Sequence, residues 1–160
     1  MILIKVIGAF LAIFSFAIVL ETPKKYLVYA GIVGAVGWLV YLLALEGGAN
    51  DVFATFLSAA AIALVSHIFA RVFKTPVTVF LVAGILPTVP GAGMYRIVYY
   101  FIQNDTAMAS YYLTITLELA GAIAIALFLV DAVFRAFQKG WKQNSLRYQE
   151  KNVDKSSKIV

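Results

Sequence analysis

The residues best suited to binding chemistry lie together in one apolar run, where two prolines and two glycines fall within seven positions. The segment from Pro87 to Arg96 reads PTVPGAGMYR. Proline lacks a backbone donor and clashes with the preceding helical turn, so a helix should break here and restart at Pro90. The first amides of the new helix, those of Gly91, Ala92 and Gly93, then lack partners and carry the positive end of the helix dipole. Such amides bind carboxylate or phosphate groups.

Three hydroxyl side chains near this break are candidates for solute contacts, namely Thr88, Tyr95 and Tyr99. The helix that ends at Leu86 offers carbonyl groups to an ammonium group or a cation. A small zwitterion or carboxylate-bearing solute suits this pair of helix ends. The alternative is a simple proline kink without a site, because prolines bend many membrane helices.

Two ionisable residues lie inside apolar segments, where a charge is expensive and usually faces the interior of a bundle. We expect Arg96 and Glu118 to lie at a similar depth, roughly 10 Å below one membrane surface, and therefore to pair. A structural ion pair and a role in solute or proton handling remain equal alternatives. Asp131 and Arg135, spaced i,i+4, are expected to form a structural pair. His67 is more typical of a hydrogen-bonded interfacial residue than of a proton relay.

The composition shows which kind of fold must position these residues. The chain of 160 residues is 62% hydrophobic and 13% charged, whereas soluble domains are about 45–50% apolar and about 25% charged. The apolar runs cover residues 2–20, 26–45, 52–70, 77–102 and 111–135. The halves of the fourth run are about 15 Å and 20 Å long, so only together do they cross about 30 Å of hydrocarbon.

These runs predict an all-α integral membrane bundle of five transmembrane helices, with the fourth broken at the Pro-x-x-Pro-Gly motif. Residues 1–135 are expected to form the transmembrane domain and residues 136–160 a basic cytoplasmic tail. Gly31, Gly34, Ala35 and Gly37 should allow close packing of the second helix, as should the small residues 58–61 and 63 of the third helix. Asp51 is expected to cap the third helix.

The charged turns predict the topology. With five crossings, the basic turns at 24–25 and 71–74 share one side with the tail, and the acidic turns at 46–51 and 103–106 lie on the other. The positive-inside rule then puts the N-terminus outside and the C-terminus in the cytoplasm. A re-entrant hairpin at the break would instead leave the basic tail external. Lys5 is the one base that does not fit this pattern.

Several functions have no support in the residues. The chain has no cysteine and one histidine, so we expect no disulfide, metal site or other cofactor. No arrangement of nucleophile, base and acid is visible, so catalysis is not expected. The net charge of +5 follows from topology and not from nucleic-acid binding.

Three features resemble one family, the short, YjjB-type (ThrE_2) branch of the threonine/serine exporters: residues 87–95, the Gln103–Asp105 turn and the apolar last helix. The likeness in hydropathy extends over residues 1–135. It implies proton-motive-force-driven export of hydroxylated amino acids or other small carboxylates, together with a companion ThrE-domain membrane protein. Arg96 matches no motif of the family, so its role depends on the argument from charge alone.

The resulting hypothesis is a multi-pass subunit of a secondary exporter in the cell inner membrane, with the break lining the pathway and Glu118 as the coupling acid. The five apolar runs show no internal repeat, so a second half must come from the companion protein or from self-association. A non-transporting scaffold that stabilises a partner, or a channel-like pore, are the alternatives.

Overall fold

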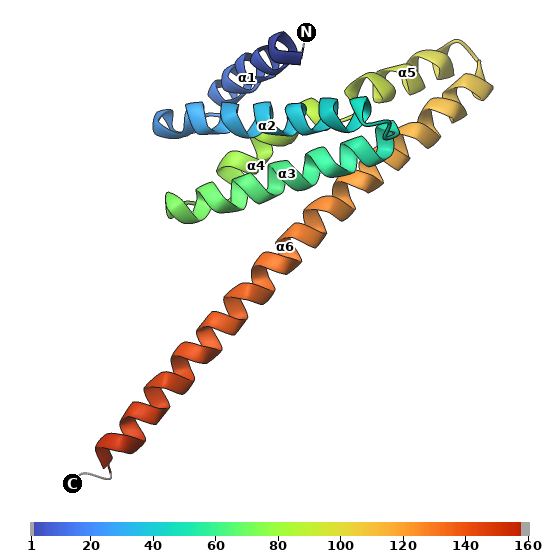
Figure 1. The fold of residues 1–160 in the computed structure, drawn as a ribbon. Helices are drawn as coiled ribbons and strands as arrows, with labels where there is room; N and C mark the ends of the chain where they lie inside the picture. The colour runs from blue at the N-terminus through green and yellow to red at the C-terminus, as the bar shows by residue number, and fades with distance from the viewer. Residues whose placement is uncertain (1, 158–160) are drawn as a thin grey trace.

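The protein is a bundle of α-helices, seen in a computed structural model that describes the backbone of residues 2–157 and the side chains of residues 2–136. The long helices are α1 (Ile2–Val19), α2 (Leu27–Glu46), α3 (Asp51–Val72) and α6 (Thr106–Ser157) (Figure 1). Two shorter ones, α4 (Thr78–Ile85) and α5 (Gly91–Ile102), follow one another between α3 and α6. Short 3-10 turns occupy Lys24–Tyr26 and Leu86–Thr88, and residues 2–157 contain no strand. The predicted all-α membrane bundle is confirmed.

Four helical segments are by themselves long and apolar enough to cross a membrane: Ile2–Val19, Lys24–Glu46, Asp51–Val72 and Thr106–Ala136. The segments Thr78–Thr88 and Gly91–Ile102 pass only as a pair, bent by 52° at the break. A re-entrant hairpin needs a near reversal of direction, whereas Figure 1 shows α5 leading onward from α4. The fourth crossing is therefore broken and bent, as the Pro-x-x-Pro-Gly motif predicts.

The glycines of α2 explain how closely the first three helices pack. A Cβ added at Gly31 or Gly34 would collide with side chains of α1, and one added at Gly37 would collide with Ile62 of α3. The hydroxyl of Ser58 donates to the carbonyl oxygen of Gly37 at 2.8 Å, which joins the same two helices. Because lipid supplies no hydrophobic force between helices, this close contact and polar bond hold α2 against α3.

The small face of α3 predicted at residues 58–63 is also confirmed. Ala59 is fully buried and packs with Ile123 and Ala126 of α6. On another side, α4 inserts Phe80 into an aromatic cluster with Tyr26, Phe69 and Phe73. The first half of the broken span is thus anchored in the core, whereas α5 packs mainly on α6 and has no buried residue.

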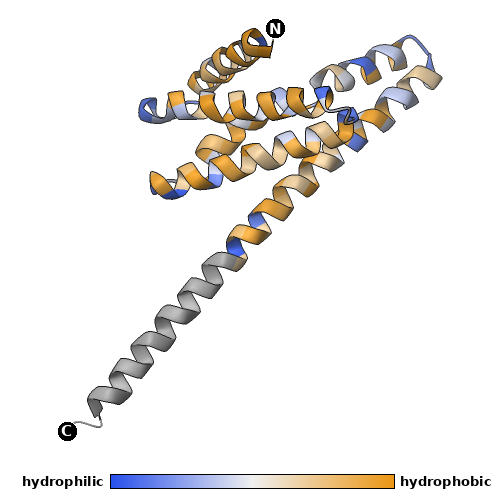
Figure 2. Cartoon of the chain, viewed as in Figure 1, coloured by the Kyte–Doolittle hydropathy of each residue, from blue (hydrophilic) through white to orange (hydrophobic). Residues whose placement is uncertain are grey.

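The charged turns gather at the two ends of the bundle. Lys24, Lys25 and Arg71 lie at the end where α2 begins and α3 ends, and Glu46 and Asp51 lie at the opposite end (Figure 2). The alternating directions of the helices produce the separation of charge that the turns predict. Helix α6 runs without interruption across residues 135 and 136, and the side chains of the predicted basic tail lie outside the described residues.

Candidate functional site

The break covers five residues, Leu86 to Pro90, in three different backbone conformations. Leu86–Thr88 form a 3-10 turn, Val89 is extended (φ −65°, ψ 129°), and Pro90 has φ −77° and ψ 56°. The last pair of angles is that of an inverse γ-turn, whose amide-to-carbonyl bond links Gly91 to Val89 at 2.8 Å. Helix α5 starts at Gly91, one residue later than the sequence predicts.

The amides at the start of α5 are only partly free. Gly91 donates to Val89, so the prediction that its amide is unpaired is wrong; the γ-turn of Pro90 turns that amide back on the chain. The amide of Met94 donates to the Pro90 carbonyl at 3.1 Å. In the part of the chain whose side chains are described, neither a backbone carbonyl outside α5 nor a capping side chain accepts from Ala92 or Gly93. Two amides therefore remain available to a solute.

The carbonyls at the end of α4 are used by the protein itself. The Thr88 hydroxyl donates to the Ile85 carbonyl at 2.7 Å, and the Val89 amide donates to the Leu86 carbonyl at 3.3 Å. The prediction that this helix end offers free carbonyls to an ammonium group is thus wrong for these two groups, because the 3-10 turn folds back over them. Thr88 is 9% exposed and its hydroxyl can still accept a hydrogen bond.

A cavity of about 190 Å³ lies directly beside the break. Its wall is formed by residues 87–90 together with Trp38, Tyr41, Asp51, Thr55 and Leu119. Sites for drug-sized ligands measure about 300–1,000 Å³, so this cavity suits a smaller solute. It brings the break together with α2, α3 and α6.

Asp51 supplies the charge of this cavity. The Tyr41 hydroxyl donates to Asp51 Oδ1 at 3.3 Å, and the Tyr41 ring stacks on Trp38 with centroids 5.1 Å apart. The prediction that Asp51 caps α3 is wrong, because Asn50 is the capping residue and accepts from the Phe53 amide at 2.9 Å. Since the cap is already provided, the Asp51 carboxylate is left to face the cavity.

The sequence comparison agrees with this architecture. The family model described as "Threonine/Serine exporter, ThrE" matches residues 5–133, which include the break and every residue of the cavity. The chain belongs to the threonine/serine exporter family. It is therefore a multi-pass membrane protein of a transport family and not of an enzyme family. No solved structure matches the chain.

The cavity of this exporter-family protein includes residues that sequence reasoning did not assign to the site, chiefly Trp38, Tyr41, Asp51 and Thr55. They come from helices distant in sequence, so no local motif connects them to the break. One signal was present. Asn and Asp are equally good helix caps. When Asn50 caps α3, the Asp51 carboxylate is free to interact elsewhere.

Arg96 and Glu118 do not pair in this exporter-family protein, so the predicted ion pair is wrong. Arg96 is exposed and its Cζ lies 5.1 Å from the centre of the Tyr112 ring. Glu118 lies six residues beyond Tyr112, which is about 9 Å along α6 and on a different face. There it lines a separate groove with Phe53 and Phe56 of α3. The expected similar depth therefore does not bring the two charges together, because Arg96 meets α6 at Tyr112 and Glu118 lies on another face further along that helix.

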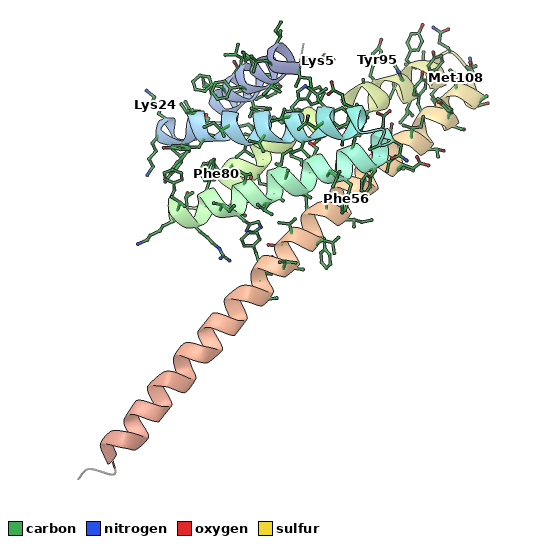
Figure 3. The ribbon with its side chains drawn as sticks, in the orientation of Figure 1. Lys5, Lys24, Phe56, Phe80, Tyr95 and Met108 are labelled. Atoms are coloured by element: carbon green, nitrogen blue, oxygen red, sulfur yellow. The ribbon has the colours of Figure 1, made fainter. Side chains whose placement is uncertain are left out.

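The other predicted residues of α5 divide between two surfaces. Tyr95 and Tyr99 stack on each other with centroids 6.1 Å apart, lie 69% and 43% exposed, and are not part of the cavity wall. Figure 3 shows the Tyr95 side chain pointing away from the bundle. A Cβ built on Gly91 meets no described atom within 4 Å, so that glycine borders open space. Gly93 instead packs against Thr116 of α6. The break thus has an open side at Gly91 and a packed side at Gly93.

A second charged group joins α3 to α6 at the basic end of the bundle. Asp131 Oδ2 lies 2.7 Å from Arg135 Nε, which confirms the predicted i,i+4 pair, and Oδ1 lies 3.6 Å from His67 Nε2. The His67 ring stacks on the Phe134 ring with centroids 4.4 Å apart, and the Arg71 Cζ lies over the Phe134 ring at 4.7 Å from its centroid. Since 3.6 Å is too long for a hydrogen bond, His67 contacts Asp131 and Phe134 without a hydrogen bond among the described residues, and its predicted hydrogen-bonded role stays a prediction.

No cluster of three or more histidine, cysteine or acidic side chains in the described part of the chain is arranged to hold a metal ion.

Proposed function

We propose that this protein is the membrane subunit of a secondary exporter for small carboxylate-bearing metabolites, either threonine- or serine-like amino acids or dicarboxylates. The observation that carries the proposal is the broken fourth span, where the amides of Ala92 and Gly93 are free next to a cavity of about 190 Å³. A solute carboxylate bound there would satisfy both amides and the positive end of the α5 dipole.

The position of the break supports a pathway rather than a kink. Non-helical backbone at membrane depth is tolerated where it borders protein or a water-filled cavity. Residues 87–90 form one wall of the cavity, and Gly91 borders open space beside it. A carboxylate that leaves water for this site exchanges its hydration for fixed amide donors, which lowers the cost of crossing.

The proposal includes an orientation, a driving force and a partner. The separation of charged turns supports an N-terminus outside and a C-terminus in the cytoplasm of the cell inner membrane. Family membership supports a proton-motive-force-driven exporter that works with a companion ThrE-domain protein or a second copy of itself. The apolar side chains exposed on every helix of the bundle are consistent with contacts to lipid and to such a partner.

The decisive experiment measures efflux of labelled serine, threonine and succinate from cells that express this chain with and without the companion protein. Gly91→Leu places a bulky side chain in the open space at the start of α5, and Gly121→Leu is the matched control, because a Cβ at either glycine meets no described atom within 4 Å. Loss of hydrogen bonds to a charged group is worth about 1.5–3 kcal/mol. We therefore expect Gly91→Leu to lower efflux about 10- to 100-fold and Gly121→Leu to leave it unchanged.

Co-purification of the partner accompanies the efflux measurement. A scaffold would keep its partner and lose no flux in Gly91→Leu, which would refute the proposed site. Collapse of the proton gradient by an uncoupler should abolish uphill efflux, whereas a pore would continue to run down the solute gradient. Unchanged efflux in the presence of the uncoupler would refute the secondary exporter.

A further inference from the structure

The cavity beside the break has an acidic lining. Asp51 is the only charged residue in its wall, and no lysine or arginine contributes to that wall within the described residues. Three hydroxyl-bearing residues, Tyr41, Thr55 and Thr88, share this wall with Asp51. This is a lining that accepts hydrogen bonds and favours positive charge, in contrast to the amides of α5 that follow it in the chain.

The hydrogen bonds inside the cavity leave acceptors unused. Tyr41 donates to Asp51 Oδ1, so the second carboxylate oxygen has no protein donor among the described hydrogen bonds. Thr55 is 4% exposed, and its hydroxyl takes part in none of the side-chain hydrogen bonds found in residues 2–136. The Thr88 hydroxyl uses its proton on Ile85 and keeps its lone pairs. Thr55 and Thr88 are buried, and buried polar groups normally find partners, whereas Asp51 is exposed. A donor that enters the cavity can therefore reach these unused oxygens.

A primary ammonium group matches this lining. It carries three donors and one positive charge, and the unused oxygens of Asp51, Thr55 and Thr88 are its natural acceptors. The ring of Trp38 adds an aromatic face to the wall, and indole is the best of the aromatic groups for a cation. A carboxylate in the same place would face Asp51 without any cationic side chain between them.

We propose that Asp51 binds the ammonium group of the transported solute and thereby selects α-amino acids over dicarboxylates, an inference that rests on the proposed export function. The solute's carboxylate then meets the amides of Ala92 and Gly93, and its ammonium group lies in the cavity. A dicarboxylate places its second carboxylate against Asp51, and like charges placed side by side at a binding site disfavour it by about 100-fold.

The test compares serine and succinate transport by the chain reconstituted in liposomes with its companion protein. Asp51→Asn removes the charge and keeps the shape. Glu46→Gln is the matched control, since Glu46 belongs to the same acidic turn, is exposed and does not line the cavity. We expect the wild type to favour serine by about 100-fold. Asp51→Asn should lower serine flux at least about 10-fold and leave succinate flux unchanged or higher, and Glu46→Gln should resemble the wild type.

A second variant protects the test against a folding defect, because Asp51 also lies at the start of α3. Thr55→Val keeps the volume of the side chain and removes only the hydroxyl, so serine flux should fall about threefold to tenfold without change in succinate flux. Thermal denaturation of each purified variant shows whether it is folded.

The outcomes separate the inference from the proposed function. The inference is wrong if Asp51→Asn has the same preference between serine and succinate as the wild type. It is also wrong if the folded Asp51→Asn variant loses serine flux and succinate flux to the same extent, because Asp51 then does not recognise the ammonium group. Wild-type preference for succinate would also overturn it. If the wild type with its companion moves neither solute, the proposed function itself is refuted.

Discussion

The contact between Gly93 and Thr116 makes a sharp prediction about how α5 is held. A Cβ added to Gly93 would collide with Thr116 Oγ1, whereas it would lie 3.5 Å from Thr116 Cβ and 3.8 Å from Cγ2, which are ordinary contact distances. Only one atom of α6 therefore forbids a side chain here. Gly93→Ala should therefore destabilise the protein through a clash with that oxygen, and a variant that lacks the oxygen should tolerate the alanine.

The expected changes in the free energy of unfolding follow from the general costs of overpacking. Overpacking a fitted contact costs about 1–3 kcal/mol, partly offset by up to about 1 kcal/mol that alanine gains over glycine in a helix. Gly93→Ala should thus destabilise the protein by about 1–2 kcal/mol. Thr116 Oγ1 is buried without a hydrogen-bond partner among the described groups, so Thr116→Ala should be within about 1 kcal/mol of neutral. The double variant should be at least as stable as Thr116→Ala alone, a coupling of about 2 kcal/mol.

The assay is the free energy of unfolding of the purified protein, measured by titration of SDS into a mild detergent. Thr116→Val serves as the control, because it puts a methyl group where the oxygen was and should not rescue Gly93→Ala. Equal destabilisation by Gly93→Ala in the wild-type and Thr116→Ala backgrounds would show that α5 and α6 do not meet in this way.

Two further predictions concern contacts between helices. Ser58→Ala removes the 2.8 Å bond from Ser58 to the Gly37 carbonyl and should lower the free energy of unfolding by about 0.6 kcal/mol and by no more than about 1.7 kcal/mol, the average and the maximum for hydrogen bonds between membrane helices. A loss below about 0.3 kcal/mol, half of that average, in the same SDS titration would contradict it. Asp131→Asn weakens the contacts to Arg135 and His67 and should lower the thermal midpoint in detergent more than Glu118→Gln does, since no described ion pair includes Glu118. Equal midpoints for these two variants would mean that the α3–α6 charge cluster contributes no stability.

The family, the fold class and the break were predictable from the sequence because each depends on local chemistry. Long apolar runs leave a chain in lipid no alternative to helix. Two prolines three residues apart interrupt a helix wherever they occur, and the segment at residues 87–95 resembles its family directly. The packing role of the α2 glycines was also predictable, since close approach of two backbones requires small residues.

The local hydrogen bonds at the break were only partly predictable. The γ-turn at Pro90 uses the Gly91 amide, and the Thr88 hydroxyl caps the Ile85 carbonyl. Both details depend on torsion angles that the prolines permit but do not specify. The same holds for the cap of α3, where two adjacent residues were equally suitable and the backbone used Asn50.

The cavity itself was decided by tertiary structure. Depth along a helix follows from counting residues, but the direction in which a side chain points relative to other helices depends on how the bundle packs. For this reason Arg96 and Glu118, which were expected at a similar depth, face different neighbours. Asp51 shares a cavity wall with residues 87–90 through the packing of α2, α3 and α6. The sequence alone determined that a span breaks and what kind of protein this is. Packing determined which acid faces the break, because rotation of each helix about its axis is set by its neighbours and not by its own residues.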